Sequence, residues 1–258
     1  MYHGMINILP RTALHSSPFI RFLADLAIDG TNEAADWKHQ KPSFAERLAG
    51  WLDLTDAIAL ASALATKEGK TPAMLSRASS ELEAQLAQVR SALAESIRAG
   101  GISQPGKARI KLPAPTAAAD FASYRRYYAA HQRDMEASIS TLRAGVRMVL
   151  AKRSPALRQL AELDAVLDKA IGERERNLLA SVQQLIEKHF LQLRQAHHQT
   201  LAESQQTDDP ARWMQAGGWL ARFCQDMQGV LLAELEVRLQ PVQGLIEAFS
   251  NEVTGRNE

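Results

Sequence analysis

The stretch Ser123–Asp134, with the sequence SYRRYYAAHQRD, gathers side chains that can stack on rings, bind anions and transfer protons. It holds three of the chain's four tyrosines, one histidine and three arginines. Such a cluster suits a nucleic-acid surface, a catalytic cluster or the wall of a helix bundle. Tyr124, Tyr128 and His131 recur at helical intervals, so they share one face of a helix. We therefore interpret the tyrosines as a buried bundle wall, with His131 in its seam.

Arg125, Arg126 and Arg133, together with Gln132, are expected to point away from that wall and to be available to an acidic partner. Residues 104–153 contain ten Lys or Arg against three Asp or Glu, whereas the whole chain has a net charge of +1. A basic segment of this kind binds phosphate groups in a salt-dependent way. No recognised nucleic-acid-binding motif accompanies it. A nucleic-acid-associated helical protein that uses residues 104–133 is therefore the alternative function.

No stretch of the sequence has all the residues and flanking elements that a catalytic or metal-binding motif requires. Gly101 to Lys107 matches the phosphate-binding pattern G-x-x-x-x-G-K, but Ala108 stands where that motif needs a magnesium-binding Ser or Thr, and no strand precedes it. The three histidines of residues 189–198 share one expected helix without a carboxylate at metal-ligand spacing. The sequence contains no H-E-x-x-H, E-x-x-H or G-x-S-x-G motif. We expect no catalytic residues, no cofactor and no bound metal.

The elements that must position these side chains are helices. Ala, Leu, Gln, Glu and Arg are abundant, and these residues lose little side-chain freedom in a helix. Alternating runs of Val, Ile and Thr, which are typical of strands, are missing. Apolar residues make up 46% of the chain, which is enough for a core of its own. The predicted fold class is all-α.

Three long helices are expected in the second half, over residues 117–152, 155–206 and 210–250. A serine or aspartate followed by proline begins the second and the third of them. Short connections make consecutive helices antiparallel neighbours, and the middle helix would be roughly 75 Å long. Apolar residues at heptad spacing are typical of a coiled-coil face. The sequence thus predicts an elongated helical bundle with long antiparallel, coiled-coil-like helices.

Proline and glycine also suggest a division of the chain. Residues 1–100 form an expected N-terminal helical region, and residues 117–258 form the long-helix C-terminal bundle. Between them, residues 101–116 contain three prolines and form a basic linker, which we expect to be mobile and outside any core.

The sequence indicates a cytoplasmic protein. No apolar stretch approaches the roughly 20 residues that a transmembrane helix needs, and the first residues lack the pattern of a secretory signal. The single cysteine, Cys224, falls on an apolar helical stripe. A buried thiol in a reducing compartment is the expected state.

The last expected helix offers a candidate interaction surface. Its apolar stripe, wider than one neighbouring helix requires, includes Trp213, Leu220, Phe223 and Met227. Large exposed apolar patches are rare on monomers, so we expect this stripe to dock with a partner protein or with a second copy of the chain. The alternative is that the N-terminal helices fold back and cover it.

Three stretches of the chain are similar in sequence to other proteins. They read RTALHSSPFIRFLADL (11–26), RLAGWLDLTDAIALASAL (47–64), and DFASYRRYYAAHQRDMEASISTLR (120–143) continuing into SPALRQLAELDAVLDKAIGERERNLL (154–179). The chain resembles an uncharacterised family of helical proteobacterial proteins over most of residues 11–195. Genes of that family often neighbour those of MotA/ExbB-like and OmpA/MotB-like proteins.

The resemblance therefore implies a cytoplasmic partner of an inner-membrane, motor-like or envelope complex, and it implies no catalytic residues. The predicted function is a non-enzymatic helical interaction or adaptor protein.

Overall fold

The structure is a computed structural model that describes Phe19, Leu52 and residues 54–64, 76–102, 110–113 and 120–254. These residues form five α-helices: α3 (Leu54–Leu64), α4 (Ser76–Arg98), α5 (Phe121–Ala151), α6 (Pro155–Ser204) and α7 (Trp219–Thr254). Two strands of two residues each, β1 (Gly101–Ile102) and β2 (Ile110–Lys111), and one 3-10 turn (Pro210–Arg212) complete the elements. The all-α prediction is confirmed.

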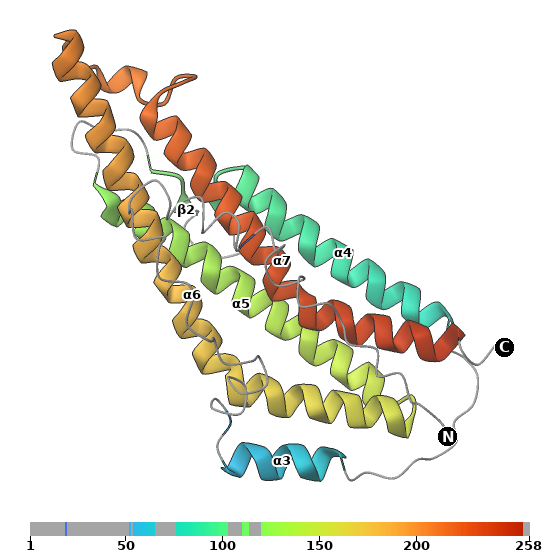
Figure 1. Cartoon of the computed structure of the whole chain (residues 1–258). Coiled ribbons are helices and arrows are strands. Elements are labelled where there is room, and N and C mark those ends of the chain that lie inside the picture. Colours follow the sequence, from blue (N-terminus) through green and yellow to red (C-terminus); the bar gives the residue numbers. More distant parts are fainter. Residues whose placement is uncertain are drawn as a thin grey trace, which may run out of the picture.

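The helices build an elongated bundle around α7, which contacts α4, α5 and α6 (Figure 1). α6 turns back along α5 after a three-residue connection, so that Arg143 meets Asp164 while the earlier Arg125 meets the later Glu187. The hydroxyl of Ser154 accepts a hydrogen bond from the N–H of Leu157 at 3.1 Å and thereby caps α6. The coiled-coil character of these long helices stays a prediction.

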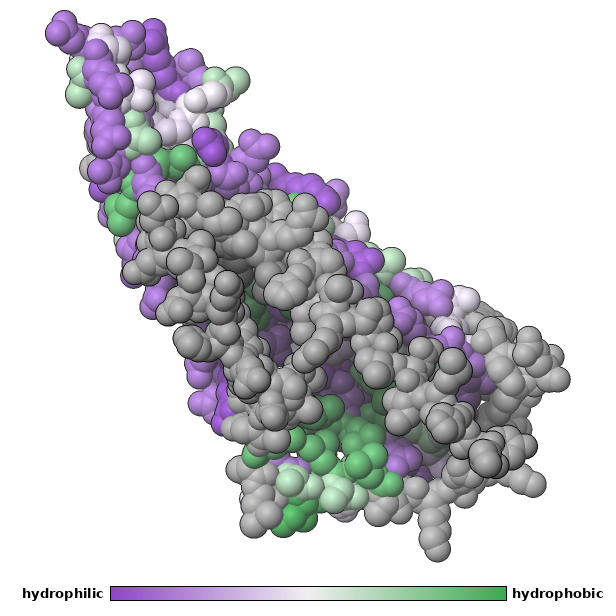
Figure 2. All heavy atoms as spheres, in the orientation of Figure 1, coloured by the Kyte–Doolittle hydropathy of each residue, from purple (hydrophilic) through white to green (hydrophobic). Residues whose placement is uncertain are grey.

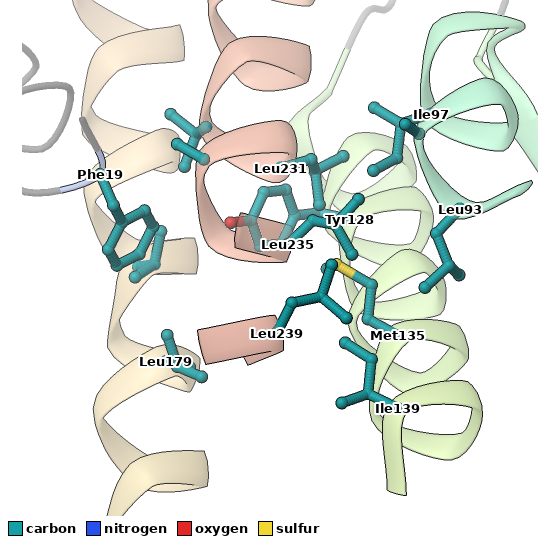
Figure 3. Close-up of a cluster of buried hydrophobic side chains, with 14 of the residues drawn as sticks. Phe19, Leu93, Ile97, Tyr128, Met135, Ile139, Leu179, Leu231, Leu235 and Leu239 are labelled. Atoms are coloured by element: carbon teal, nitrogen blue, oxygen red, sulfur yellow. The ribbon is translucent and has the colours of Figure 1, made fainter. Parts of the chain in front are cut away.

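The core changes in character along the bundle. At one end it is aromatic: the Phe223 ring on α7 meets the rings of Tyr124 and Phe190 edge to face at centroid distances of 5.3 and 5.0 Å. Aliphatic side chains follow towards the other end, including Leu235 and Leu239 (Figure 3). Aromatic pairs in this geometry are favourable beyond the apolar area that they bury.

The N-terminal half contributes to the same core. Leu93 and Ile97 of α4 point into the cluster that α5 and α7 form (Figure 3). In the first part of the expected N-terminal helical region, Phe19 lies within the described residues, and its side chain is buried in this cluster. Residues 20–51 lie outside the described part of the chain.

The segment expected to be a linker is partly attached to the bundle. Gly101 pairs with Lys111 in the β1–β2 ladder, and the N–H of Leu112 donates to the carbonyl of Gly100 at 2.8 Å. Leu112 packs against the core, so the expectation that this segment stays outside any core is wrong for that residue. Residues 103–109 and 114–119 lie outside the described part of the chain.

The last helix begins nine residues later than the sequence suggested, at Trp219 instead of residue 210. Gly217 has a φ of +84°, and a Cβ on Gly218 would lie 2.2 Å from the carbonyl oxygen of Trp213. This tight turn stacks the ring of Trp213 against that of Trp219 at 5.4 Å. Pro241 does not end α7, although both α6 and α7 change direction part-way along (Figure 1).

We predict that Gly218→Ala lowers the free energy of unfolding by about 2–3 kcal/mol, because its Cβ would meet a backbone atom that cannot move aside. Gly145→Ala is the matched control: nothing lies within 4 Å of its added Cβ. That control should raise stability by up to about 1 kcal/mol, since alanine favours a helix interior. Urea unfolding of both variants measures the two effects, and equal stabilities would contradict the tight turn.

Candidate functional site

The four apolar candidates for an interface lie inside the molecule. Leu220 and Phe223 are 0% exposed, and Met227 and Trp213 are also buried. The chain's own helices α4, α5 and α6 cover α7, which corrects the expectation of an exposed stripe. These side chains stabilise the fold and are not retained as a docking surface.

The three basic candidates remain on the surface of α5, as the helical spacing predicted. Arg125 lies over the ring of Phe121 and forms a 2.6 Å ion pair with Glu187 of α6. Arg126 donates a hydrogen bond to the hydroxyl of Ser123. The ion pair with Glu187 reduces the positive charge that the Arg125 end of α5 presents to solvent.

Gln132 and Glu234 form the centre of a buried polar layer that the sequence reading missed. Gln132 was expected to point outward, yet it is buried, and Glu234 of α7 is 0% exposed. The hydroxyl of Tyr128 donates to Glu234 at 2.6 Å, and the amide of Gln132 donates to it at 3.0 Å. Nε of Arg238 donates to the same carboxylate at 2.9 Å. The negative charge is thus surrounded by donors, as a buried carboxylate requires.

The amide of Gln132 links three helices at this level. Its Nε2 also donates to the carbonyl of Leu179 on α6, at 3.1 Å. Its Oε1 accepts from Nε2 of Gln183, one turn further along α6, at 2.7 Å. One side chain of α5 therefore holds α6 and α7 in fixed register.

This polar layer is enclosed within the bundle. Burial, followed by the negative charge of Glu234, raises the pKa of Tyr128 well above its usual value, so the phenol remains a hydrogen-bond donor. Glu234 is closed off from solvent, and no substrate can reach its oxygens. The feature of the sequence that could have indicated this layer is the pair Glu234 and Arg238, four residues apart on an otherwise apolar helix face.

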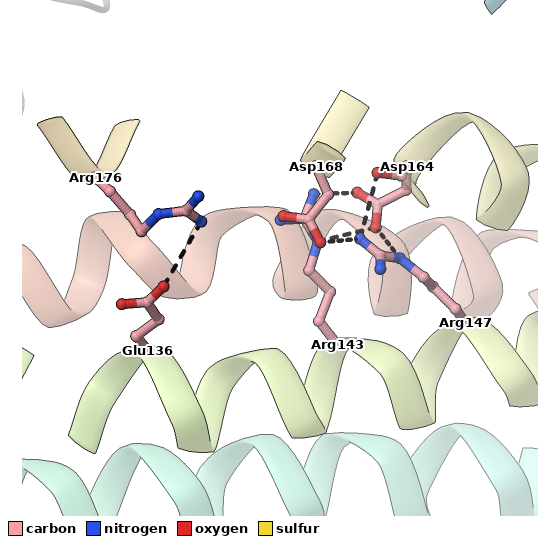
Figure 4. A network of polar contacts seen from close by, with 6 residues as sticks. All are labelled: Glu136, Arg143, Arg147, Asp164, Asp168 and Arg176. Atoms are coloured by element: carbon pink, nitrogen blue, oxygen red, sulfur yellow. Dashed lines mark hydrogen bonds and ion pairs between the residues drawn. The ribbon is translucent and has the colours of Figure 1, made fainter. Parts of the chain in front are cut away.

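A second polar cluster joins α5 to α6 (Figure 4). Arg143 donates to Asp164 through Nη2 at 2.6 Å and to Asp168 through Nη1 at 2.8 Å. Arg147 meets the same two carboxylates at 2.6 and 2.7 Å. Burial alone would lower the pKa of Arg147, but its hydrogen bonds to Asp168 and Asp164 raise it. Two bidentate arginines thus neutralise two aspartates and fix the hairpin.

Several buried groups have no hydrogen-bond partner among the described residues. They include the hydroxyls of Tyr124 and Tyr127 and Nε2 of His131. Burial lowers the pKa of His131 to about 4, although the carboxylate of Asp134 works in the opposite direction. Burial also raises the pKa of the Cys224 thiol to about 12, which confirms the buried cysteine expected from the sequence. A thiol of this kind is not a nucleophile at neutral pH.

No cluster of His, Cys, Asp and Glu within the described residues has the arrangement of a metal site. None of the helices in the described ranges combines the length and the apolar character needed to cross a membrane.

Helix α3 has exposed apolar side chains, whereas the apolar side chains of α7 are buried. Its sequence, LTDAIALASAL, has a single charged residue, Asp56. Ile58 and Leu64 are 62% and 61% exposed. The helix lies against the outside of α6, where Nε2 of Gln159 donates to the carbonyl of Leu64 at 2.8 Å. Figure 2 shows a hydrophobic area at this corner of the molecule. We take α3 as the candidate functional site.

Glu234→Ala should lower the free energy of unfolding by about 3–5 kcal/mol, because it leaves the guanidinium of Arg238 buried without its counter-charge. Glu236→Ala is the matched control, since Glu236 is 55% exposed and pairs with Arg90 at 3.2 Å. Surface pairs contribute about 1 kcal/mol or less. Thermal unfolding of the two variants gives the comparison, and similar losses would contradict a structural role for the polar layer.

The protein should lose stability as the pH falls below about 6.5, because unfolded His131 takes up a proton there while the folded side chain, with a pKa of about 4, does not. The loss grows as the pH approaches 4 and reaches roughly 3 kcal/mol at most. His131→Phe removes this proton uptake, so the difference in stability between pH 7 and pH 5 should shrink. An unchanged difference, measured by urea unfolding at both pH values, would show that His131 is not buried in the neutral form.

No curated protein and no solved structure matches this chain. Residues 5–251 match the model of a family described as protein of unknown function (DUF3348). The match spans nearly the whole sequence, and the chain belongs to that family.

Proposed function

We propose that this chain is a non-enzymatic helical interaction or adaptor protein that binds another protein through α3. The observation that carries the proposal is the exposure of Ile58 and Leu64 on a helix with one charged residue. Leaving large aliphatic side chains in water is unfavourable by about 1.5–3 kcal/mol each relative to full burial. A partner that covers α3 recovers this free energy.

The attachment of α3 supports the same role. The helix packs on α6, whose Gln159 satisfies the carbonyl at the C-terminal end of α3. Its apolar face is therefore presented on a long, folded support and is ordered before a partner arrives. Pre-ordering of this kind favours binding because less conformational entropy is lost on association.

The partner is a protein, with a second copy of the chain as the competing occupant of α3. The resemblance described above favours a cytoplasmic location and a partner in an inner-membrane, motor-like or envelope complex. An amphipathic or apolar helix of the partner fits best, because helices recognise one another through apolar residues at intervals of three and four.

The experiment is photo-crosslinking from position 61, an exposed alanine of α3 between Ile58 and Leu64, in cells that make the native protein. We expect a crosslinked protein that disappears when Ile58 and Leu64 are both replaced by Glu. Both side chains are exposed, so the double variant should keep its stability within about 1 kcal/mol. Leu191→Glu is the matched control, because Leu191 is another exposed leucine, near the far end of α6.

Loss of the crosslink in the Leu191→Glu control as well, or no crosslink at all, would contradict docking through α3. Size measurement of the purified protein separates a second copy from a different partner. Recovery of nucleic acid whose binding weakens steeply with salt would instead favour the alternative function of Arg125, Arg126 and Arg133.

A further inference from the structure

A cavity of about 260 Å³ lies between α5, α6 and α7, next to the polar layer. Its walls include Gly172 of α6 and Pro241 of α7. Glycine contributes no side chain to fill the space, and proline interrupts the hydrogen bonding of its helix. Both helices change direction along their length (Figure 1), and proline inside a helix is a common cause of such a bend.

Several positively charged side chains line the cavity. Four positively charged side chains reach it: Arg143, Lys169, Arg176 and Arg238. The side chain of Arg238 is only 10% exposed, and it contacts Glu234 through Nε and Nη2. Within the described residues no acceptor meets its third nitrogen, Nη1. A largely buried guanidinium that is fixed by one carboxylate and lines a cavity keeps donors that can bind an oxygen anion.

Three carboxylates also line the cavity, and two of them are already engaged. Asp168 is bound by both Arg143 and Arg147, and Glu136 lies 3.7 Å from Arg176 across the cavity wall (Figure 4). Glu175 and Lys169 have no ion pair within the described part of the chain. After this pairing, the free groups are one lysine, one glutamate and the spare guanidinium donors.

We infer that this cavity binds a small anion of the phosphate or carboxylate type. Arg238 donates to it, Lys169 neutralises its charge, and Arg176, whose contact with Glu136 is long at 3.7 Å, adds a further donor. Glu175 opposes binding through like-charge repulsion and so limits affinity. The anion joins α5, α6 and α7 where their packing is incomplete, and this site is separate from the α3 surface.

The test uses the full chain and measures its melting temperature at constant ionic strength. Inorganic phosphate is titrated in one arm and succinate in the other, each replacing chloride. We expect a saturable rise in at least one arm, because a ligand that binds only the folded state stabilises it. The arm that responds identifies whether phosphate or carboxylate is preferred.

Variants at the mouth distinguish this site from general salt effects. Lys169→Gln and Arg176→Gln should each raise the half-saturating concentration roughly tenfold, as expected for a lost charge-assisted hydrogen bond. Glu175→Gln should lower it. Lys188→Gln, an equal charge change at an exposed position further along α6, should leave it unchanged.

No saturable rise in either arm would overturn the inference. So would equal responses in all four variants, or a response to Lys188→Gln as large as that to Lys169→Gln. These results are independent of whether α3 binds a partner, so the two proposals can fail separately.

Discussion

The burial of the Glu234 carboxylate is the constraint on which the arrangement of the long helices depends. A carboxylate without solvent is tolerated only where several donors surround it. Here Tyr128 and Gln132 come from α5 and Arg238 from α7 itself, while Gln132 also binds the backbone of α6. Apolar side chains alone would allow long helices to slide past one another by a turn. A slide of about 5 Å at this level would leave the charge unpaired, so the polar layer selects one register.

The core differs on the two sides of that polar layer. On the side towards Trp219 the core is aromatic, and large rings fill the space between α5, α6 and α7. On the opposite side the Arg143 and Arg147 pairs with Asp164 and Asp168 tie α5 to α6 near the hairpin turn. Between them lies the cavity, whose walls include Gly172 and Pro241. The bundle is therefore aromatic at one end, joined by ion pairs near the hairpin turn, and polar in the middle.

The sequence predicted those parts of the structure that depend on local spacing. Tyr124, Tyr128 and His131 are buried as their helical intervals indicated, and Ser154 caps α6 as the serine–proline pair suggested. Gln132 was misassigned because its polarity suggested solvent, while its actual partner lies 102 residues away in the chain. The late start of α7 was missed because the apolar spacing continues through residues 213–220, although Gly217 and Gly218 form a tight turn there. Contacts between distant residues leave no periodic signal, so they cannot be predicted from one sequence.

The apolar faces of α7 and α3 also show that exposure depends on contacts between distant parts of the chain. Both α7 and α3 carry an apolar face; α7 is the longer helix, whereas α3 has a single charged residue. α7 is enclosed because three neighbouring helices converge on it, whereas α3 packs mainly on α6. The number of neighbours, and not hydrophobicity, therefore decides which stripe belongs to the core and which remains exposed to solvent. For an elongated bundle, this places binding capacity on peripheral helices that the central packing does not need.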